Sequence, residues 1–166
     1  WAGPGTGTVS VNQTSAFGCD SAVSENVLII QTPKPVIVLA NDSTCENKIA
    51  SYSVTPVAGE SYAWSVAGGS IIGSPSASSI NVLWGAPGTG TVSLTQTSAW
   101  GCDSSVSSNV IIVPTPKPVI VLPNDTACEN KILSYSITTP SAGHAYAWTV
   151  SGGAIIGSAA GTSINV

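Results

Sequence analysis

Residues 84–105 have the sequence WGAPGTGTVSLTQTSAWGCDSS, and residues 1–22 have the sequence WAGPGTGTVSVNQTSAFGCDSA. The correspondence, at an offset of 83 positions, extends well beyond this stretch, since TPKPVIVL occurs at 32 and again at 115. Later in the repeat the second copy has one extra residue, so SINV at 80 matches SINV at 163 at an offset of 84. The chain is therefore a tandem repeat, and a unit of about 83 residues suits a small self-contained domain.

The composition indicates β-structure. Hydrophobic residues make up 43% of the chain and charged residues only 7%. Ser, Thr, Val, Gly and Ala are abundant, and β-branched residues favour strands whereas Gly, Pro, Ser and Asn interrupt helices. The formal net charge is −4 with only four basic residues, so no basic surface could neutralise a phosphate backbone and nucleic acid is not an expected partner.

Membrane insertion is not expected either, because no apolar run approaches the roughly 18 residues that span a bilayer. The sequence has neither an initiating Met nor a signal peptide with a charged start and a small-residue cleavage site. We therefore expect an internal piece of a longer chain or a processed form.

Apolar residues alternate with polar ones in SYAWSV, SINVLW and TVSLTQT, which predicts strands with one buried face. The expected inward-facing residues are Tyr62, Trp64, Val66, Ile80, Val82, Trp84, Val92 and Leu94. PVIVL at 35 and 118 and NVIIV at 109 are denser apolar runs, which are typical of strands that are covered on both sides or that lie at a domain junction. Turn signals recur about every ten residues, so the pattern predicts an all-β fold of antiparallel immunoglobulin-like β-sandwich domains with seven or so short strands each.

The Thr-Pro-Lys-Pro segments at 32 and 115 mark the expected domain boundaries, because proline stiffens the chain and cannot donate to a sheet. One complete domain is expected over 32–114. Residues 1–31 would be the last two strands of a preceding repeat, and 115–166 the first strands of a following one. Within the complete domain, strands are predicted at 35–40, 48–55, 61–67, 70–73, 79–84, 90–99 and 106–113.

The order of these motifs resembles a known group of repeats. A Cys, then YSVTPVAGESYAWSVAGG, then SINVLWGAPGTGTVSLTQTSAWGCDSS, then NVIIV is similar to the PKD-like and immunoglobulin-like repeats of giant Bacteroidota surface proteins, including gliding-motility adhesins exported by type 9 secretion. The Y-x-W strand, the V-x-W-G turn and the closing G-C are its most specific parts. Polycystic-kidney-disease modules proper often carry W-x-F-G-D-G where this chain has WSVAGGS, so the resemblance is to the wider group.

This resemblance covers the whole repeat and implies extension, display and adhesion at an extracellular bacterial cell surface. The implied partners are neighbouring repeats of the same fibre, with surface polysaccharide or other cells as further candidates. It brings no catalytic residues and no cofactor. The alternatives are a carbohydrate-binding or spacer module of a secreted enzyme, with Phe17 and Trp100 as its exposed aromatic candidates, or a filament subunit. In that subunit, residues 1–31 of one copy would supply strands to 115–166 of another.

The residues themselves assemble no enzyme or metal site. His144 is the single histidine and corresponds to Glu60 in the other repeat, and a general base needs a positioned partner. The stretch GAPGTGT lacks a Lys-Ser/Thr ending and precedes a strand, so it predicts a tight turn, not a phosphate loop. Asp42 and Glu46 offer two carboxylates where Ca²⁺ takes six to eight oxygens, so Asn-Asp at 41–42 predicts a turn.

Two cysteines recur in each repeat, without His neighbours or C-x-x-C spacing, which predicts disulfides in an oxidising compartment and argues against zinc. They are Cys19, Cys45, Cys102 and Cys128. One pairing joins Cys45 to Cys102 within a domain. The other joins the cysteine after the first strand of one domain to the cysteine between the last two strands of the next domain. This pairing is considered because the turns that carry the two cysteines are expected at opposite ends of a sandwich. The sequence leaves both pairings open.

Two further sets of residues are candidates for specific roles. Short Asp-Ser/Thr tripeptides resemble the acceptor pattern of Bacteroidota O-glycosylation and make Ser21, Ser43 and Thr126 candidate glycosylation sites. Aromatic residues on alternating strand faces are predicted to belong to the core and not to ligand platforms. These core aromatics are Tyr62, Trp64, Trp84, Tyr146 and Trp148.

Overall fold

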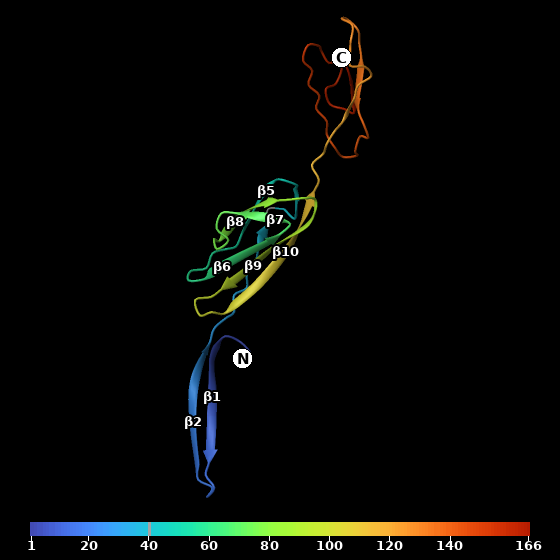
Figure 1. Cartoon of the computed structure of the whole chain (residues 1–166). Helices are drawn as coiled ribbons and strands as arrows, with labels where there is room; N and C mark the ends of the chain where they lie inside the picture. Colours follow the sequence, from blue (N-terminus) through green and yellow to red (C-terminus); the bar gives the residue numbers. More distant parts are fainter. Residues whose placement is uncertain (40) are drawn as a thin grey trace. The chain divides into compact units, whose positions relative to one another are not determined.

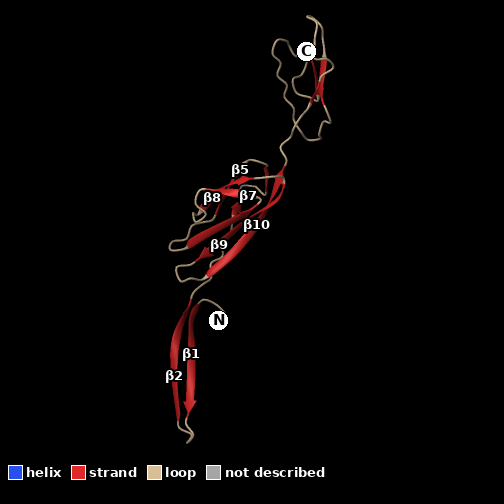
Figure 2. Ribbon diagram, viewed as in Figure 1, coloured by secondary structure: helices blue, strands red, loops and turns tan. Residues whose placement is uncertain are grey.

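The structure, a computed structural model, describes residues 1–39 and 41–166 (Figure 1). Every regular element in this described part is a β-strand (Figure 2), which confirms the all-β prediction. Across the same residues, no helix has the length and apolar character needed to cross a membrane. The chain divides into two compact units, Trp1–Thr115 and Pro116–Val166.

The first part of the chain is a long hairpin. Strands β1 (Gly5–Thr14) and β2 (Asp20–Ile29) pair antiparallel, with Gly5 opposite Ile29. One face carries hydrogen-bonded hydroxyl pairs, such as Ser10 and Ser24 at 2.8 Å. The other face carries valines that are exposed to solvent, including Val9. The hairpin therefore has regular backbone pairing and an uncovered apolar face.

The middle of the chain folds into two four-stranded sheets (Figure 1), with strand orders β4-β10-β9-β6 and β3-β5-β8-β7. Their strands are β3 (Val38–Leu39), β4 (Ser43–Cys45), β5 (Ile49–Ser53), β6 (Ser61–Ala67), β7 (Gly69–Ile72), β8 (Ser79–Trp84), β9 (Gly88–Thr97) and β10 (Asp103–Val113). Side chains from the inner faces of both sheets form one buried cluster. This arrangement confirms the β-sandwich prediction, and we call it the central domain.

Of the expected first strand at 35–40, the structure shows only β3, and the chain then enters the other sheet as β4. β3 pairs antiparallel with β5, and β4 pairs parallel with β10, with Cys45 opposite Val113. The last residue of the expected strand, at position 40, lies outside the described residues. The prediction missed β4 because Ser-Thr-Cys has no apolar alternation, and only its pairing with β10 makes it a strand.

The two dense apolar runs of the central domain are covered on one side only, so burial on both faces, the first of the two alternatives, does not hold, and a place at a domain junction stays a prediction. In PVIVL, Ile37 is buried whereas Val36 and Val38 are exposed. In NVIIV, Val110 is buried whereas Ile111 is exposed. Each run lies in a sheet whose outer face is uncovered, so alternate apolar side chains remain in solvent.

Trp84 is at the centre of the core and is fully buried. Its Nε1 donates to the hydroxyl of Tyr52 at 3.0 Å, and the two rings meet edge to face with centroids 6.1 Å apart. A Cβ built on Gly90 would lie 2.9 Å from two atoms of the Trp84 ring and closer still to a third. The predicted tight turn of GAPGTGT is therefore confined to its start, since the stretch enters β9 at Gly88. Within β9, Gly90 makes room for the indole.

Residues 116–166 form a smaller, three-stranded sheet. Its order is β11-β12-β13, made of β11 (Ile120–Val121), β12 (Ser134–Ile137) and β13 (Ser163–Asn165). These strands correspond in sequence to β3, β5 and β8. Residues 145–151 correspond to β6 and are fully described, but they form no strand. Among the described strands β6 pairs with β9, and residues 116–166 contain no counterpart of β9.

Candidate functional site

The turn that joins β9 to β10 presents a cysteine and an exposed aromatic residue. The backbone N–H of Ser98 donates to the carbonyl of Cys102 at 2.8 Å, and the N–H of Cys102 donates to the Ser98 hydroxyl at 3.1 Å. Gly101 has φ = 79°, a left-handed conformation that favours glycine. Trp100 in this turn is 71% exposed. The side chain of Ser98 therefore fixes a compact turn whose tip points an aromatic ring into solvent.

The same turn occurs in the hairpin. The N–H of Ser15 donates to the carbonyl of Cys19 at 2.8 Å, and the N–H of Cys19 donates to the Ser15 hydroxyl at 3.1 Å. Phe17 replaces the Trp and is 96% exposed. Because the turn forms here without a surrounding sandwich, its geometry is set by its own residues.

The second kind of cysteine, Cys45, is the last residue of β4 and opens a turn that holds the end of β10. The N–H of Lys48 donates to the carbonyl of Cys45 at 3.3 Å across Asn47, which has φ = 57°. The N–H of Glu46 donates to Val113 O at 2.9 Å, and its carboxylate Oε1 accepts from the N–H of Thr115 at 2.9 Å. The hydrogen bond between Glu46 and Thr115 was not predicted. The one signal for it in the sequence is that Glu46 recurs in the next repeat as Glu129.

Within the central domain, Cys45 and Cys102 are too far apart for a disulfide. Cys45 pairs with Val113 at one end of β10, and Cys102 immediately precedes Asp103 at the other end. Ten residue steps along a strand span roughly 33 Å, whereas bonded cysteines have Cα atoms about 4–7 Å apart. All four cysteines are free thiols in the structure. The geometry thus does not allow Cys45 to bond to Cys102 within one domain, and the disulfides themselves stay a prediction.

The candidate glycosylation residues are all exposed. Ser21 lies in β2, Ser43 lies in β4, and Thr126 lies in the loop between β11 and β12. Their hydroxyls are therefore open to modification, and their glycosylation stays a prediction.

The candidate core aromatics differ between the two parts of the chain. Tyr62, Trp64 and Trp84 are buried in the central domain, whereas Tyr146 and Trp148 are only half-buried. Their local hydrogen bonds are the same in both parts. Trp64 Nε1 donates to a backbone carbonyl at 2.8 Å, and Trp148 Nε1 does so at 2.9 Å. Local backbone contacts therefore orient these rings, and full burial needs the strands that residues 116–166 do not contain.

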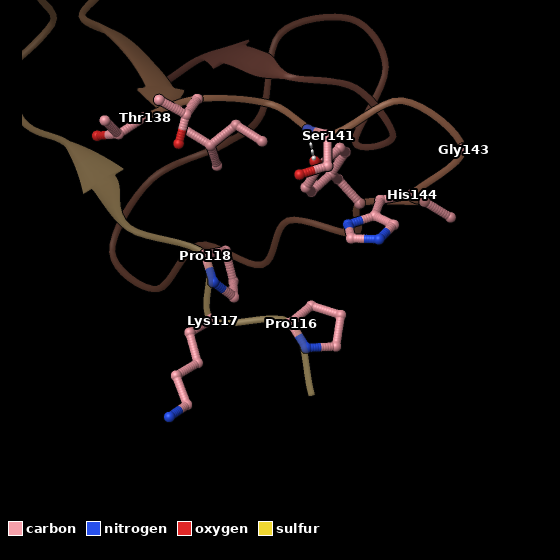
Figure 3. A pocket seen from close by; sticks show the side chains of 11 residues that line it. Pro116, Lys117, Pro118, Thr138, Ser141, Gly143 and His144 are labelled. Carbon is pink, nitrogen blue, oxygen red and sulfur yellow. Dashed lines mark hydrogen bonds between the residues drawn. The ribbon is translucent and has the colours of Figure 1, made fainter. Parts of the chain in front are cut away.

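His144 lies at the rim of a cavity of about 410 Å³ between the Thr-Pro-Lys-Pro segment and the loop around 138–146 (Figure 3). Its side chain is exposed, and it shares the rim with Pro116 and Lys117. In the same loop, the N–H of Ser141 donates to the hydroxyl of Tyr146 at 3.0 Å. The described residues that line this cavity include no carboxylate, so the imidazole has no partner there that would orient it as a general base.

Asp42 contributes to the fold through its backbone, because its carbonyl accepts from the N–H of Ile111 at 2.8 Å. In residues 1–39 and 41–166, no group of three or more His, Cys, Asp and Glu side chains is close enough together to hold a metal ion.

The central domain also contains a buried amide side chain, Gln96, and a buried phenol, Tyr52. Gln96 is buried and donates from Nε2 to a carboxylate oxygen of Glu60, while its Oε1 has no hydrogen-bond partner. Burial raises the pKa of Tyr52, and the hydrogen bond from Trp84 opposes this shift. Tyr52 also borders a cavity of about 240 Å³, and its hydroxyl accepts the hydrogen bond from the buried indole of Trp84.

The architecture defines an all-β chain with a β-sandwich in its middle, preceded by a hairpin and followed by a three-stranded sheet. The family model of the PKD-like domain matches residues 31–112 and again 114–166. These matches cover most of the sequence, so the chain belongs to the PKD-like domain family.

The solved structures include a chain of the human desmocollin-1 ectodomain, which is 11% identical in sequence and matches with a TM-score of 0.30. The match covers 96% of the present chain and 38% of the desmocollin chain, so this chain spans well under half the length of that ectodomain. No curated protein matches the sequence.

Proposed function

We propose that this chain is part of a long extracellular fibre or cell-surface adhesin, in which tandem sandwich domains provide extension and display. In this proposal residues 1–31, 32–114 and 115–166 belong to three successive repeats. The family is one of structural and adhesive modules, and the described residues offer no paired acid and base, so the role is mechanical and not catalytic.

The observation that carries the proposal is the direction of the first and last strands of the central domain. β4 runs parallel to β10, and β10 is the last strand of the domain. From Ile37 to Cys45 the chain advances eight residues toward the end of β10, which is up to about 26 Å for extended chain. The chain therefore enters the sandwich at one end and leaves it at the other, so each added repeat lengthens the molecule.

The outer face of β9 and β10 supports an exposed, extended role. Opposed hydroxyl and amide side chains bond to each other across the two strands. These pairs are Thr91 with Asn109 at 3.2 Å, Ser93 with Ser107 at 2.8 Å and Thr95 with Ser105 at 2.8 Å. Such cross-strand pairs stabilise a sheet without charge, and they keep the outer face hydrophilic in a chain that has very few ionic groups.

We further propose that the cysteines link successive repeats, so that a Cys45-type residue of one repeat bonds to a Cys102-type residue of the next. The separation of about 33 Å along β10 supports this, because it leaves each cysteine without a partner in its own domain. The two cysteine turns lie at opposite ends of the sandwich, where a chain of domains has its junctions. Such bonds would resist extension and would place the protein in an oxidising compartment outside the cell.

The first experiment is to detect the native protein, with an antibody raised against residues 1–166, on a denaturing and reducing gel and on intact cells. The fibre proposal expects a mass many times 16.6 kDa and labelling of the cell surface without permeabilisation. A mass near 16.6 kDa, or labelling that needs permeabilised cells, would overturn it. Non-reducing peptide mapping then tests the bonds, and a peptide that links Cys45 to Cys102 of one repeat would contradict the proposed pairing.

A second candidate function is carbohydrate binding, and the exposure of Phe17 and Trp100 favours it. Aromatic rings that protrude from a rigid turn can stack on sugars. Phe17 and Trp100 each lie at the tip of such a turn, in equivalent positions of two repeats. The test is retention of the chain on an array of purified polysaccharides. Loss of retention in the double variant Phe17→Ser, Trp100→Ser would support this function, and unchanged retention would remove the two turns as its site.

A further inference from the structure

Most of one backbone edge of β10 is unpaired. The strand runs along a margin of the central domain (Figure 1), and β4 pairs only with Ile111–Val113. In residues 1–39 and 41–166, no strand pairs with the remainder, Asp103–Val110, on the side away from β9. These residues are nevertheless regular strand, because they pair without interruption with β9 on their other side. We call this unpaired side of Asp103–Val110 the open edge.

The direction of the backbone groups on the open edge follows from the end of β10. The N–H of Ile111 donates to Asp42 O at 2.8 Å, and Val113 O accepts from the N–H of Glu46 at 2.9 Å, so both groups point away from β9. Alternate residues of a strand direct their N–H and C=O groups to the same side. The odd-numbered residues therefore offer donors and acceptors to the open edge, and they are Asp103, Ser105, Ser107 and Asn109.

The other edges of the two sheets are short or covered. β3, β4 and β7 have two, three and four residues. The middle of β6 is covered by a loop, because the N–H of Trp64 donates to Pro75 O at 2.8 Å. Natural sheets protect their edges with short strands, covering loops, Lys, Pro or bulges. The open edge has the sequence DSSVSSNV and a continuous register with β9, so it has none of these protections and is suited to pairing with another strand.

The side chains of the open edge complement those of a second copy that runs antiparallel about a two-fold axis at Val106. Ser105 then lies opposite Ser107 of the second copy, and the same pair recurs on the other side of the axis. Ser93 and Ser107 already form such a pair across β9 and β10, with their hydroxyl oxygens 2.8 Å apart. A hydroxyl has one donor and two acceptor positions, so Ser107 can bond to a neighbour on each side.

The one charged residue of the open edge, Asp103, lies opposite Asn109 in this arrangement. The side-chain oxygen of Asn109 accepts from Thr91 Oγ1 at 3.2 Å, so its Nδ2 is the group that remains to donate across the open edge. An amide nitrogen is a suitable donor to the carboxylate of Asp103 in the second copy. The arrangement therefore opposes no like charges, which would destabilise a strand pair.

We propose that the open edges of two copies pair antiparallel about Val106 and join their sheets into one. Ser105 and Ser107 of each copy exchange main-chain hydrogen bonds with Ser107 and Ser105 of the other. The main-chain bonds supply affinity, and the alternating side chains supply specificity. The contact is isologous, so it gives a closed dimer. It lies along the side of the central domain and not at a domain junction, so it holds whether or not the fibre function is correct.

The mass of the purified chain in reducing buffer tests the proposal. Light scattering after size-exclusion chromatography is expected to show twice 16.6 kDa at the higher of several concentrations. The double variant Ser105→Lys, Ser107→Lys is expected to be monomeric, because each lysine would face a lysine of the second copy. The matched control is Ala63→Lys, Ser65→Lys, at the same levels of the same face but on β6. It is expected to dimerise as the parent chain does.

An exchange of charge separates lost pairing from lost folding. Mixing the Ser105→Lys, Ser107→Lys chain with a Ser105→Glu, Ser107→Glu chain is expected to restore a dimer with one chain of each kind, since each lysine then faces a glutamate. A parent chain that is monomeric at every concentration would overturn the proposal. Association that persists unchanged in the lysine variant, or a mixture that stays monomeric, would overturn it too.

Cross-linking tests the register independently. In a background with the four native cysteines replaced by Ser, a chain carrying Ser105→Cys is mixed with a chain carrying Ser107→Cys and oxidised. The expected product is a disulfide dimer of the two different chains, at several times the yield obtained when Ala63→Cys replaces Ser107→Cys. Equal yields from the two mixtures, or no mixed dimer from the first, would contradict the proposed pairing.

Discussion

Replacing Gly90 by Ala is expected to destabilise the central domain through a direct clash with the indole of Trp84. A Cβ at this position would lie 2.9 Å from the ring atoms Cε3 and Cη2, and still nearer to Cζ3, where ordinary contacts begin at 3.4 Å. The indole cannot yield easily, because it is fully buried and Nε1 donates to the hydroxyl of Tyr52 at 3.0 Å. The backbone N–H of Trp84 is also fixed, since it donates to Lys48 O at 3.1 Å.

The expected cost follows from these constraints. Forcing an extra methyl group into a packed core costs about 1–3 kcal/mol, and occasionally more. Gly90 lies on β9 between β6 and β10, so the strand cannot move away without disturbing both neighbours. We therefore expect Gly90→Ala to lower the free energy of unfolding by about 3 kcal/mol, the upper part of that range. For a domain of this size, this corresponds to a drop in melting temperature of about 12–24 °C.

Hydrogen exchange of the β9 and β10 amides is the appropriate assay, because it reports on the central domain alone within the chain. Thr91→Ala is the control, since its side chain lies on the outer face and bonds only to Asn109 among the described residues. Protection unchanged in Gly90→Ala would refute the clash. So would an equal loss of protection when Gly90→Ala is made in a Trp84→Leu background, because a steric cause requires the two substitutions to couple.

Three other substitutions are expected to have distinct effects. Tyr52→Phe leaves the buried N–H of Trp84 without its acceptor and should cost about 1–3 kcal/mol in urea unfolding. Because burial raises the pKa of Tyr52 above its ordinary value of 10.0, the folded state favours the neutral phenol. The neutral phenol of Tyr52 contributes fully to the free energy of unfolding below pH 10.0, and this contribution is lost as the pH rises through the folded pKa. The stabilities of the parent and of Tyr52→Phe should therefore converge in strong alkali. Leu94→Ala should cost about 2–5 kcal/mol, measured in the same way, because the side chain is fully buried. Trp100→Ser should change stability by less than about 0.5 kcal/mol, since the ring is in solvent.

The sequence was sufficient to predict the strands that alternate. Tyr62, Trp64, Ile80, Val92 and Leu94 were all expected to face inward, and all are buried. Their side chains alternate because one face of each sheet is packed and the other is open, and that property is local to each strand. The continuous apolar runs show no alternation, so the sequence left open how many of their faces are covered, and that number depends on the layers of the whole domain.

The remaining elements depend on residues distant in the chain. β4 is a strand because it lies against β10, and Glu46 holds Thr115 across 69 positions of sequence. No local pattern specifies such a pairing. The cysteines illustrate both local and long-range effects. Ser98 and Gly101 fix the turn before Cys102 through local contacts. The separation of Cys45 from Cys102, by contrast, follows only from the parallel pairing of β4 with β10.

The contrast between β6 and residues 145–151 shows that the earlier strands of a repeat need the last two strands in order to pair, whereas the last two strands pair with each other. Nearly the same sequence is a strand where β9 is present and no strand where it is absent. The β1–β2 hairpin keeps the full register of β9 and β10 without any partner strand, since its two strands are joined by a five-residue turn and close through local contacts. Hairpins of this kind form in about 1–10 μs, so the last two strands of a repeat can assemble first and then serve as the template on which the earlier strand pairs.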